Sequence, residues 1–248
     1  MRLISLCPSL TELVFDLGAG DELLARTKFC IHPQPDVERI EKVGGTKNPK
    51  VARIVELAPD LVLMNEEENR REDAEAIREA GIRVHSSLPR TAQETAAMVR
   101  SIGGAIGRGS RAEEIARDIE RRAERVRRAA EGRPPVSFAY LIWREPWMTV
   151  NGDTFVDAML TLAGGRNVFG GRDERYPTIG IEELRDAAPD AVLLSSEPFP
   201  FGTKHIEELA RLTGFEPGRF ALVDGELLSW HGSRTPRGID YAESVIVR

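Results

Sequence analysis

The sequence lacks an excess of basic residues, and it lacks any long apolar run. Lysine and arginine number 34 against 40 aspartate and glutamate residues, which gives a net charge of −6. A protein that binds nucleic acid needs basic residues to neutralise phosphates, so we expect no nucleic-acid partner. No apolar run approaches the ~18 residues that cross a membrane, so we expect no membrane insertion. The apolar content of 41% and the charged content of 30% are typical of a soluble globular protein.

An export signal is also missing from the start of the sequence. Met1 and Arg2 lead directly into residues 3–6, without the basic region, apolar stretch and cleavage site of a signal peptide. The sequence as it stands therefore predicts a cytoplasmic protein. A mature exported protein with a replaced start codon would look the same.

Cysteine is scarce, because Cys7 and Cys30 are the only two in the chain. They could form a disulfide in an exported protein, or they could stay free thiols in a reducing compartment. Their spacing does not decide between the two states. The missing export signal favours free thiols.

The sequence does contain an internal repeat. Residues 54–63, IVELAPDLVL, are echoed by residues 183–194, ELRDAAPDAVLL. Each copy has the pattern of a helix end, a proline and a short buried strand. Polar residues follow each strand, at 65–68 and 195–198, and ligands of open α/β sheets bind at the carboxyl ends of strands. Chance recurrence of a common connection is the alternative, but the position of each copy in its own half of the chain favours two lobes with a cleft.

Helices and strands alternate in both halves, which predicts an α/β fold with parallel sheets. Between the halves, residues 110–131 carry apolar side chains at spacings of three and four, with charged pairs such as Glu113 and Arg117 on the opposite face. This pattern predicts one long helix with a solvated face. A coiled-coil arm or a nucleic-acid contact is disfavoured, because acids balance most of the arginines. We expect an N-terminal α/β lobe at 1–108, a bridging helix at 109–133 and a C-terminal α/β lobe at 134–248.

Two local patterns lie outside the repeat. Ser9 and Glu12 have the spacing of a capping box, which predicts a helix that begins after Ser9. The glycine-rich residues 103–109 lie between two predicted helices and lack the Lys-Ser/Thr ending of a phosphate-binding loop. They therefore predict a turn between helices.

Several segments resemble one protein family, in the same order along the chain. They are RLISLCPSLTEL at 2–13, GGTKNP at 44–49, the Ala-Pro-Asp strand entries, NGDTF at 151–155 and AGGRNVF at 163–169. The chain resembles the cobalamin- and siderophore-type substrate-binding proteins of ABC importers and looks most like their vitamin B12 branch. This resemblance implies two Rossmann-like lobes with parallel sheets, bridged by one long rigid α-helix, and a ligand held between the lobes. It also implies a non-enzymatic monomer that needs no cofactor, in a family that is usually periplasmic or anchored at the cell surface.

The resemblance implies a partner as well, the permease of an ABC importer. Members of the family dock on the permease through an acidic residue on the outer face of each lobe. Glu182 matches this position in the second lobe, whereas the first-lobe position is Ala52, with Glu56 one helical turn away. A methyl group cannot replace a carboxylate in an electrostatic docking contact. A soluble carrier that has lost this coupling is therefore the alternative.

Aromatic residues follow the predicted strands of the second half. Trp143, Trp147 and Trp230 come just after strand ends, and Tyr176 lies in a loop. A large flat ligand such as a corrin ring needs aromatic faces and a few polar partners, although these tryptophans could equally be core residues. The predicted ligand-binding residues are Cys30, His32, Gly45, Asn65, Glu66, Trp143, Trp147, Tyr176, Glu197, Trp230 and His231.

His32 and His231 are the candidate metal ligands. Together with Cys30 and one of the glutamates at 66–68, they could hold zinc or iron. Either histidine could instead be the axial ligand to the cobalt of a corrinoid or the iron of a haem. Each could also be an ordinary loop histidine, and we expect His85 and His205 to be structural.

The leading hypothesis is non-enzymatic binding of a cobalamin-like corrinoid or a related metal chelate in the inter-lobe cleft. The protein would act as the substrate-binding protein of an importer or as a soluble carrier. Direct binding of a metal ion, or binding of haem or a siderophore, is one alternative. An enzyme that processes a metal chelate through Cys, His and Glu side chains is another, but no nucleophile and base occur at a diagnostic spacing.

Overall fold

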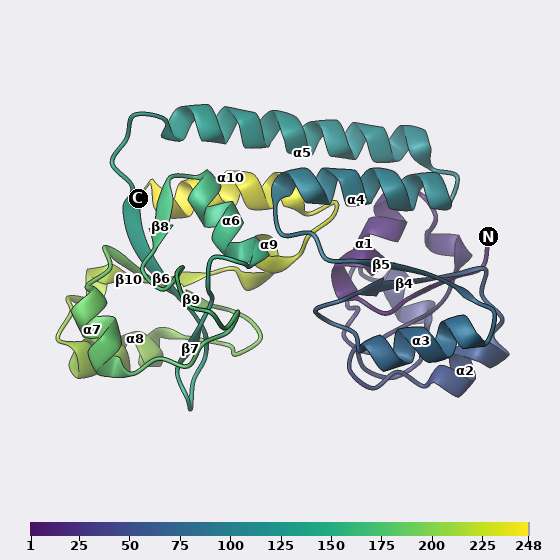
Figure 1. The fold of residues 1–248 in the computed structure, drawn as a ribbon, viewed down its shortest axis with the longest axis horizontal. Coiled ribbons are helices and arrows are strands. Elements are labelled where there is room, and N and C mark those ends of the chain that lie inside the picture. The colour runs from purple at the N-terminus through teal and green to yellow at the C-terminus, as the bar shows by residue number, and fades with distance from the viewer. Residues whose placement is uncertain (248) are drawn as a thin grey trace. The chain divides into compact units, whose positions relative to one another are not determined.

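The computed structural model describes residues 1–247, which form two compact units (Figure 1). Unit 1 comprises Met1–Pro89, Gln93–Asp118 and His231–Arg234, and unit 2 comprises Arg90–Ala92, Ile119–Trp230 and the residues from Thr235 onward. Each unit contains a sheet whose strands are mainly parallel, which confirms the predicted α/β fold with two lobes. None of the helices within residues 1–247 combines the length and the apolar character that crossing a membrane requires.

Unit 1 is built on a parallel sheet with the strand order β3-β2-β1-β4-β5. Its elements are β1 (Leu3–Ser5), α1 (Pro8–Asp16), β2 (Leu23–Arg26), β3 (Glu41–Lys42), α2 (Val51–Glu56), β4 (Leu61–Asn65), α3 (Arg71–Glu79), β5 (Arg83–Ser87) and α4 (Ala92–Ala105), with 3-10 turns η1 (Gly20–Glu22) and η2 (Asp36–Arg39). The strand order reverses between β1 and β4. The carboxyl ends of these two strands therefore form a topological switch point, where open α/β sheets bind ligands.

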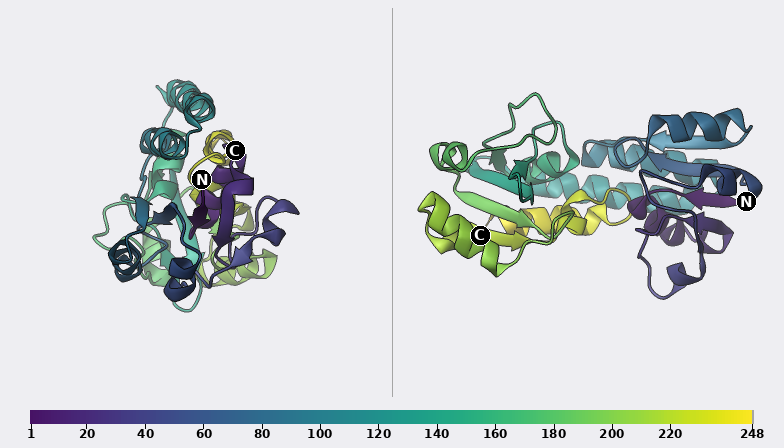
Figure 2. Two further views of the ribbon diagram at one scale, coloured as in Figure 1. Left: turned by 90° about the vertical axis from the view of Figure 1, so that its right-hand side faces the viewer. Right: turned by 90° about the horizontal axis from the view of Figure 1, so that it is seen from below.

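Helices α2 and α3 pack against each other on one face of this sheet (Figures 1 and 2). Val62 and Met64 of β4 are buried there against Ile54 of α2 and Ile77 of α3. All five residues of β4 are buried, because helices cover both faces of a parallel sheet. This explains why the strand is a continuous apolar run in the sequence.

Unit 2 is built on a second sheet, with the order β10-β9-β6-β7 and with β8 also paired to β6. β8, β9 and β10 join it in parallel, and the short β7 is antiparallel to β6. Its elements are β6 (Val136–Trp143), β7 (Met148–Thr149), α6 (Phe155–Leu162), β8 (Gly165–Asn167), α7 (Ile181–Ala187), β9 (Ala191–Ser195), α8 (Thr203–Thr213), the 3-10 turn η3 (Pro217–Arg219), β10 (Phe220–Val223), α9 (Gly225–Ser229) and α10 (Thr235–Ile246). Helices α7 and α8 bury Leu184 and Leu209 in the core of this unit.

The repeat in the sequence coincides with a repeat in the structure. The neighbouring strands β8-β6-β9-β10 of unit 2 correspond to β2-β1-β4-β5 of unit 1. Residues 51–60 and 181–190 have the same degree of burial at every position. Helix α2 therefore corresponds to α7, and strand β4 corresponds to β9.

The Ala-Pro-Asp connection makes the same contacts in both copies. Ala58 and Ala188 have positive φ angles of 44° and 41°, which turn the chain out of the preceding helix. Asp60 then accepts a hydrogen bond of 2.7 Å from the backbone N–H of Arg2, at the start of β1. Asp190 accepts one of 2.8 Å from the backbone N–H of Ser137, the second residue of β6. Each aspartate thus ties its own strand to the neighbouring first strand of the sheet.

The predicted long helix is α5 (Gly109–Ala130). Its residues belong to unit 1 as far as Asp118 and to unit 2 from Ile119 onward. The predicted pair of Glu113 and Arg117 is present, with an N–O distance of 2.7 Å. The turn between α4 and α5 comprises residues 106–108 and lies within the predicted glycine-rich stretch, whose residues 103–105 still belong to α4.

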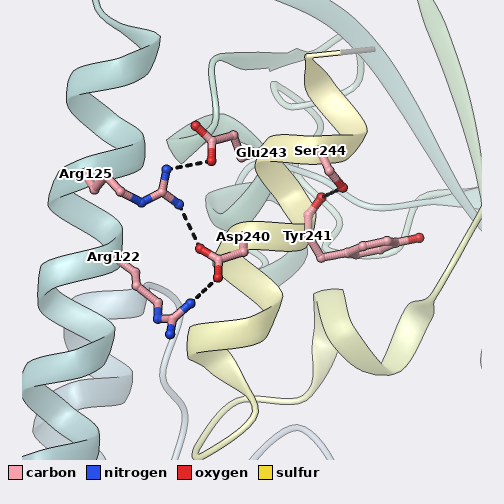
Figure 3. A network of polar contacts seen from close by, with 6 residues as sticks. All are labelled: Arg122, Arg125, Asp240, Tyr241, Glu243 and Ser244. Atoms are coloured by element: carbon pink, nitrogen blue, oxygen red, sulfur yellow. Dashed lines mark hydrogen bonds and ion pairs between the residues drawn. The ribbon is translucent and has the colours of Figure 1, made fainter.

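Within unit 2, α10 lies beside the second half of α5 (Figure 3). Arg125 of α5 forms ion pairs of 2.8 Å with both Asp240 and Glu243 of α10. Arg122, one turn earlier, also binds Asp240. Part of the charged face of the long helix is therefore used to hold the C-terminal helix of the same unit.

The predicted capping box at Ser9 is wrong. Helix α1 already begins at Pro8, whose fixed φ and missing N–H suit the first position of a helix, so Cys7 occupies the N-cap position. The side chain of Ser9 is buried in the first helical turn, and Glu12 pairs with Arg234. Ser9 is consequently available to the polar cluster described next, and Glu12 holds the arginine that anchors the segment of His231.

Candidate functional site

Polar side chains gather at the switch point of unit 1. We call Cys7, Ser9, Asn65 and His231 the N-terminal cluster. Nε2 of His231 lies 3.4 Å from Oγ of Ser9 and 3.4 Å from Nδ2 of Asn65. The histidine side chain is buried, and this burial lowers its pKa to about 4. His231 is therefore neutral at pH 7.

Residues 231–234 belong to unit 1, although the chain on both sides of them belongs to unit 2. Arg234 anchors this segment through two hydrogen bonds of 2.8 and 2.7 Å from its guanidinium group to the carboxylate of Glu12 on α1. Gly232 has a φ of 114°, which residues with a side chain rarely adopt. The ion pair and the glycine together hold His231 in the N-terminal cluster.

Asn65, a predicted ligand-binding residue, organises the loop that follows β4. Its Oδ1 accepts hydrogen bonds of 3.0 Å from the backbone N–H groups of Glu67 and Glu68. Its Nδ2 donates one of 2.9 Å to the backbone carbonyl of Ser87 at the end of β5. Asn65 is only 1% exposed. Its hydrogen bonds to the loop after β4 and to the end of β5 hold these two strand ends together.

Asn69 connects further loops at the same edge of the sheet. Its Nδ2 donates hydrogen bonds of 3.0 Å to the carbonyl oxygens of Leu6 and Thr46. The predicted ligand residue Gly45 lies beside Thr46 and is buried, and a Cβ at Gly45 would come within 2.4 Å of Oδ1 of Asn48. A side chain at Gly45 would therefore displace the side chain of Asn48, whereas Gly44, with a φ of 107°, is the position where this loop requires a glycine.

Both cysteines are free thiols and both are buried, which confirms the free-thiol alternative. The sulfur of Cys30 accepts a hydrogen bond of 3.0 Å from the hydroxyl of Thr11 and lies 3.1 Å from that of Thr27. Burial raises the pKa of Cys7 to about 12 and raises that of Cys30 as well. At neutral pH both sulfurs are therefore protonated, whereas metal binding and nucleophilic attack need the thiolate.

The predicted metal cluster is not formed. Among residues 1–247, no three His, Cys, Asp or Glu side chains are grouped so that they could hold a metal ion, which overturns the grouping of Cys30, His32 and His231 with a glutamate of the 66–68 run. His32 is partly buried on the loop after β2, and Glu66 is exposed after β4. The separate role of each histidine toward the metal of a chelate stays a prediction.

A second polar cluster lies at the corresponding strand ends of unit 2. We call Tyr140, Ser195, Glu197, Ser229 and Trp230 the C-terminal cluster. The hydroxyl of Tyr140 donates a 2.9 Å hydrogen bond to Oγ of Ser195, which donates one of 2.6 Å to the carbonyl of Glu197. Oε1 of Glu197 accepts hydrogen bonds of 2.8 Å from Ser229 and from the indole N–H of Trp230. Trp230 is buried, so Glu197 fixes an indole ring within the unit.

Two predicted aromatic residues expose their rings. Trp143, at the end of β6, is 40% exposed, and Tyr176 is 37% exposed. The ring of Trp143 packs edge-on against Phe199, with a centroid distance of 5.8 Å. Trp147 is partly buried and stacks on Phe201 at 6.2 Å, with an angle of 10° between the rings. Unit 2 therefore offers aromatic faces that neighbouring rings hold in place.

Each unit has a pocket beside the carboxyl ends of corresponding strands. The pocket in unit 1 has a volume of ≈ 430 Å³ and is lined by Met64, Asn65, Glu66, Asn69, Arg70, Arg71, Ala74, Arg78 and Ser86. The pocket in unit 2 has a volume of ≈ 510 Å³ and is lined by Ser196, Glu197, Phe201, Leu222, Val223, Asp224 and Glu226. We call the first the basic pocket and the second the acidic pocket, because arginines dominate one lining and carboxylates the other. The sequence pointed to both strand ends, through residues 65–68 and 195–198, but not to the arginines of the first lining or to Asp224 and Glu226 of the second.

The two candidate docking positions differ in charge. Glu182 on α7 is 88% exposed, and its carboxylate lies 3.7 Å from the guanidinium group of Arg185. Ala52 occupies the corresponding position on α2 and is exposed as well. The nearby carboxylate of Glu56 forms a 3.1 Å ion pair with Arg53. Only unit 2 thus has an acidic side chain at the position that the family resemblance indicates.

Known proteins resemble the chain over almost its whole length. The vitamin B12-binding protein of Vibrio cholerae is 23% identical over 244 residues, which are 98% of this chain and 87% of that protein. In structure, the periplasmic vitamin B12 binding protein BtuF of Vibrio cholerae matches with a TM-score of 0.86 at 20% identity, covering 99% of this chain and 96% of the other. The periplasmic heme-binding protein RhuT from Roseiflexus sp. RS-1 matches with a TM-score of 0.85 at 22% identity, with coverage of 99% and 96%. At such identities the structural matches establish a common fold.

The family itself follows from the sequence. The profile of the family described as "Periplasmic binding protein" matches residues 3–216, which is most of the chain. The predicted resemblance to the substrate-binding proteins of ABC importers is thereby confirmed, and proteins of the vitamin B12 branch are among the relatives. The chain belongs to the periplasmic binding protein family.

Proposed function

We propose that the protein binds a corrinoid or a related metal chelate and releases it unchanged, as the substrate-binding component of an ABC importer. The similarity to a vitamin B12-binding protein along 98% of the chain supports a corrinoid. The fold shared with a heme-binding protein makes haem the second candidate within the same class of ligand. Both are large flat rings that carry a metal, so both make the same demand on the binding surface.

The observation that carries this proposal is the exposed indole of Trp143. It ends the central strand of unit 2 with 40% of its surface exposed, and Phe199 supports it edge-on. A flat ring gains both buried apolar area and stacking energy on such a face. Tyr176 is the second exposed ring of the unit. Trp230, by contrast, is buried and bonded to Glu197, so we assign the stacking role to Trp143.

The histidines differ in how readily they could reach a metal. His231 is 8% exposed, and its Nε2 is close to both Ser9 and Asn65. His32 is only partly buried. If the metal of the chelate takes a histidine ligand, His32 is the better candidate. Glu66 and Gly45 remain proposed contacts of the ligand.

Catalysis on the chelate is disfavoured by the state of the thiols. Burial raises the pKa of both Cys7 and Cys30, so neither is a nucleophile at neutral pH. Within the N-terminal cluster His231 is neutral, and its nearest polar groups are a hydroxyl and an amide. These features support a binding role in preference to a processing enzyme.

Delivery to a permease is part of the proposal, with Glu182 as the docking residue of unit 2. Its carboxylate is 88% exposed and could meet a cationic group of a partner. The predicted cytoplasmic location stays a prediction, since the family is named for the periplasm.

A titration followed by visible absorbance and tryptophan fluorescence tests the ligand class. Cobalamin, haem and a ferric siderophore are each added to the protein, and one of them should bind. Its ring should quench the fluorescence, because it stacks on Trp143 and all three tryptophans lie in the same unit. Trp143→Ala should weaken that ligand about tenfold or more, through lost stacking and lost apolar burial. Leu212→Ala is the matched control, because Leu212 is equally exposed, at 40%, on α8 of the same unit. Failure of all three chelates to bind, or equal affinity of the two variants, would refute the proposal.

A further inference from the structure

Three arginines line the basic pocket of unit 1. Arg70, Arg71 and Arg78 line it from α3 and the residue before that helix, while Asn65 and Asn69 line it at the end of β4. Glu66 is the single carboxylate among its lining residues. The pocket therefore carries a positive charge where the fold places ligands, at the carboxyl end of a strand next to the switch point.

Two of the three guanidinium groups are not held by an ion pair. Within residues 1–247, neither Arg70 nor Arg78 forms an ion pair with another side chain. Asp73 lies close enough to Arg70 for the positive charge of Arg70 to act on the pKa of Asp73, in the lowering direction. Arg71 differs, because its Nε binds the carboxylate of Glu75 at 2.7 Å. Arginine presents a planar set of donors that fits a carboxylate or phosphate with two hydrogen bonds. Arg70 and Arg78 are thus available for such a ligand group.

The start of α3 adds to the same potential. The helix begins at Arg71, and Arg70 occupies its N-cap position without a hydrogen bond from its side chain to the first turn. The backbone N–H groups at the start of a helix carry partial positive charge and favour an anion. This contribution supplements the arginines and would be weak without them.

The acidic pocket of unit 2 is the internal comparison. It lies at the corresponding strand ends, yet Glu197, Asp224 and Glu226 line it. The repeated fold therefore creates a recess at this edge in both units without dictating its charge. The arginines are therefore specific to unit 1 and do not follow from the repeated fold.

We propose that the basic pocket is an anion-binding site that holds a carboxylate or phosphate group of the bound ligand. The inference deepens the proposed function, on which it rests for the identity of the ligand, by naming the group that anchors it. Haem offers two carboxylates and cobalamin offers one phosphodiester. The shared chemistry is a pair of anionic oxygens that faces the guanidinium groups of Arg70 and Arg78.

Titration calorimetry at low ionic strength, with inorganic phosphate and with succinate as probes, tests the site without any chelate. The double variant Arg70→Gln/Arg78→Gln should weaken the binding of these anions at least tenfold. Arg39→Gln is the matched control, because Arg39 lies in the same unit, on an exposed turn outside the pocket, and should change the affinity less than twofold. Arg70→Lys/Arg78→Lys keeps the charge and loses the planar donor pair, so its affinity should fall between the two. Absence of anion binding to the wild type, or equal effects of Arg39→Gln and the double glutamine variant, overturns the proposal.

Matched ligand pairs identify the anchoring group. If carboxylates anchor the ligand, haem dimethyl ester should bind more weakly than haem, and the double glutamine variant should remove that difference. If the phosphodiester does so, cobinamide, which lacks it, should bind more weakly than cobalamin in the same manner. If chelates bind and neither pair differs, the anchoring role is refuted. If no chelate binds while phosphate does, the proposed function fails and the anion site stands.

Discussion

In both units a helix of six or seven residues leads through Ala-Pro-Asp into a buried five-residue strand. The alanine turns the chain with a positive φ, and the aspartate bonds the first strand of its sheet in each case. Burial is the same at all positions from 51 to 60 and from 181 to 190. The connection thus has the same backbone turn, the same aspartate hydrogen bond and the same burial in both halves of the chain.

The two units diverge at the last residue of this strand. β4 ends at Asn65, which holds backbone N–H groups and lies beside a neutral imidazole. β9 ends at Ser195, which links Tyr140 to a loop that carries the carboxylate of Glu197. The pockets beyond these strands are likewise basic in unit 1 and acidic in unit 2. A repeated scaffold therefore carries different chemistry, and function must be argued from the strand ends and not from the fold.

The largest expected effect is the dependence of stability on pH that His231 gives to unit 1. Burial lowers the pKa of His231 from its ordinary value of 6.5 to about 4, so the unfolded chain takes up a proton between these values that the folded chain does not. Stability should therefore fall as the pH drops from 6.5 to 4, by roughly 3 kcal/mol from this group alone. Denaturant unfolding across this range, followed by far-UV circular dichroism, measures the loss.

His231→Gln separates this effect from the titration of carboxylates. The variant lacks the imidazole of His231 and keeps every other titrating group, so its stability should depend less steeply on pH than that of the wild type. Parallel curves for the two proteins would mean that His231 is already protonated or already solvated in the folded state.

The second comparison is between the two strand ends. Asn65→Ala leaves the N–H groups of Glu67 and Glu68 without their side-chain acceptor and removes one of the two donors to the carbonyl of Ser87, which should cost about 2–3 kcal/mol. Ser195→Ala removes the acceptor of the buried Tyr140 hydroxyl and should cost about 1–2 kcal/mol. An equal or smaller loss for Asn65→Ala would contradict the view that unit 1 depends more on its strand-end side chain.

The tryptophans make this comparison specific to each unit. All three lie in unit 2, so fluorescence follows the unfolding of that unit, while circular dichroism follows both. Asn65→Ala should shift the dichroism transition at least as much as the fluorescence transition. Ser195→Ala should shift the fluorescence transition first.

The fold could be predicted from the sequence because its signals are local. The Ala-Pro-Asp connections, the alternation of helices and strands and the apolar stripe of α5 each lie within a few helical turns of sequence. The wrong boundary at Ser9 arose because the proline signal at Pro8 competes with a capping-box spacing, and proline at the first helical position prevailed.

The candidate site was less predictable because its contacts are distant in sequence. Trp230 and His231 are adjacent in the chain but belong to different units, and Arg234 reaches Glu12 across 222 positions. No local pattern identifies such a pair. The arginines of the basic pocket were missed for another reason, since residues 70–79 contain four acids and three arginines, and the sequence does not show that the arginines, and not these acids, line the pocket.

The docking positions extend the comparison to a partner. Glu182 of α7 and Ala52 of α2 occupy corresponding positions, and only the first is acidic. Glu182→Arg should weaken coupling to a cognate permease about tenfold, because it places like charges together, while ligand affinity stays unchanged. Ala52→Glu should strengthen the coupling. Ligand uptake with purified protein and permease measures both, and equal transport by wild type and Glu182→Arg would remove the docking role.

The smallest expected effect tests whether the shared connection is strained in the same way in both units. Ala58 and Ala188 have φ angles of 44° and 41°, in the left-handed region where a Cβ is unfavourable. Glycine relieves this strain but adds entropy to the unfolded chain, so Ala58→Gly and Ala188→Gly should each stabilise by about 0.5–1 kcal/mol. Ala80→Gly is the control, because Ala80 also follows a helix but has a φ of −75°, and it should destabilise by roughly 0.5 kcal/mol. Thermal unfolding measures all three variants. Stabilisation at only one of the two alanines would mean that the packing around the connections, and not the backbone alone, sets their energy.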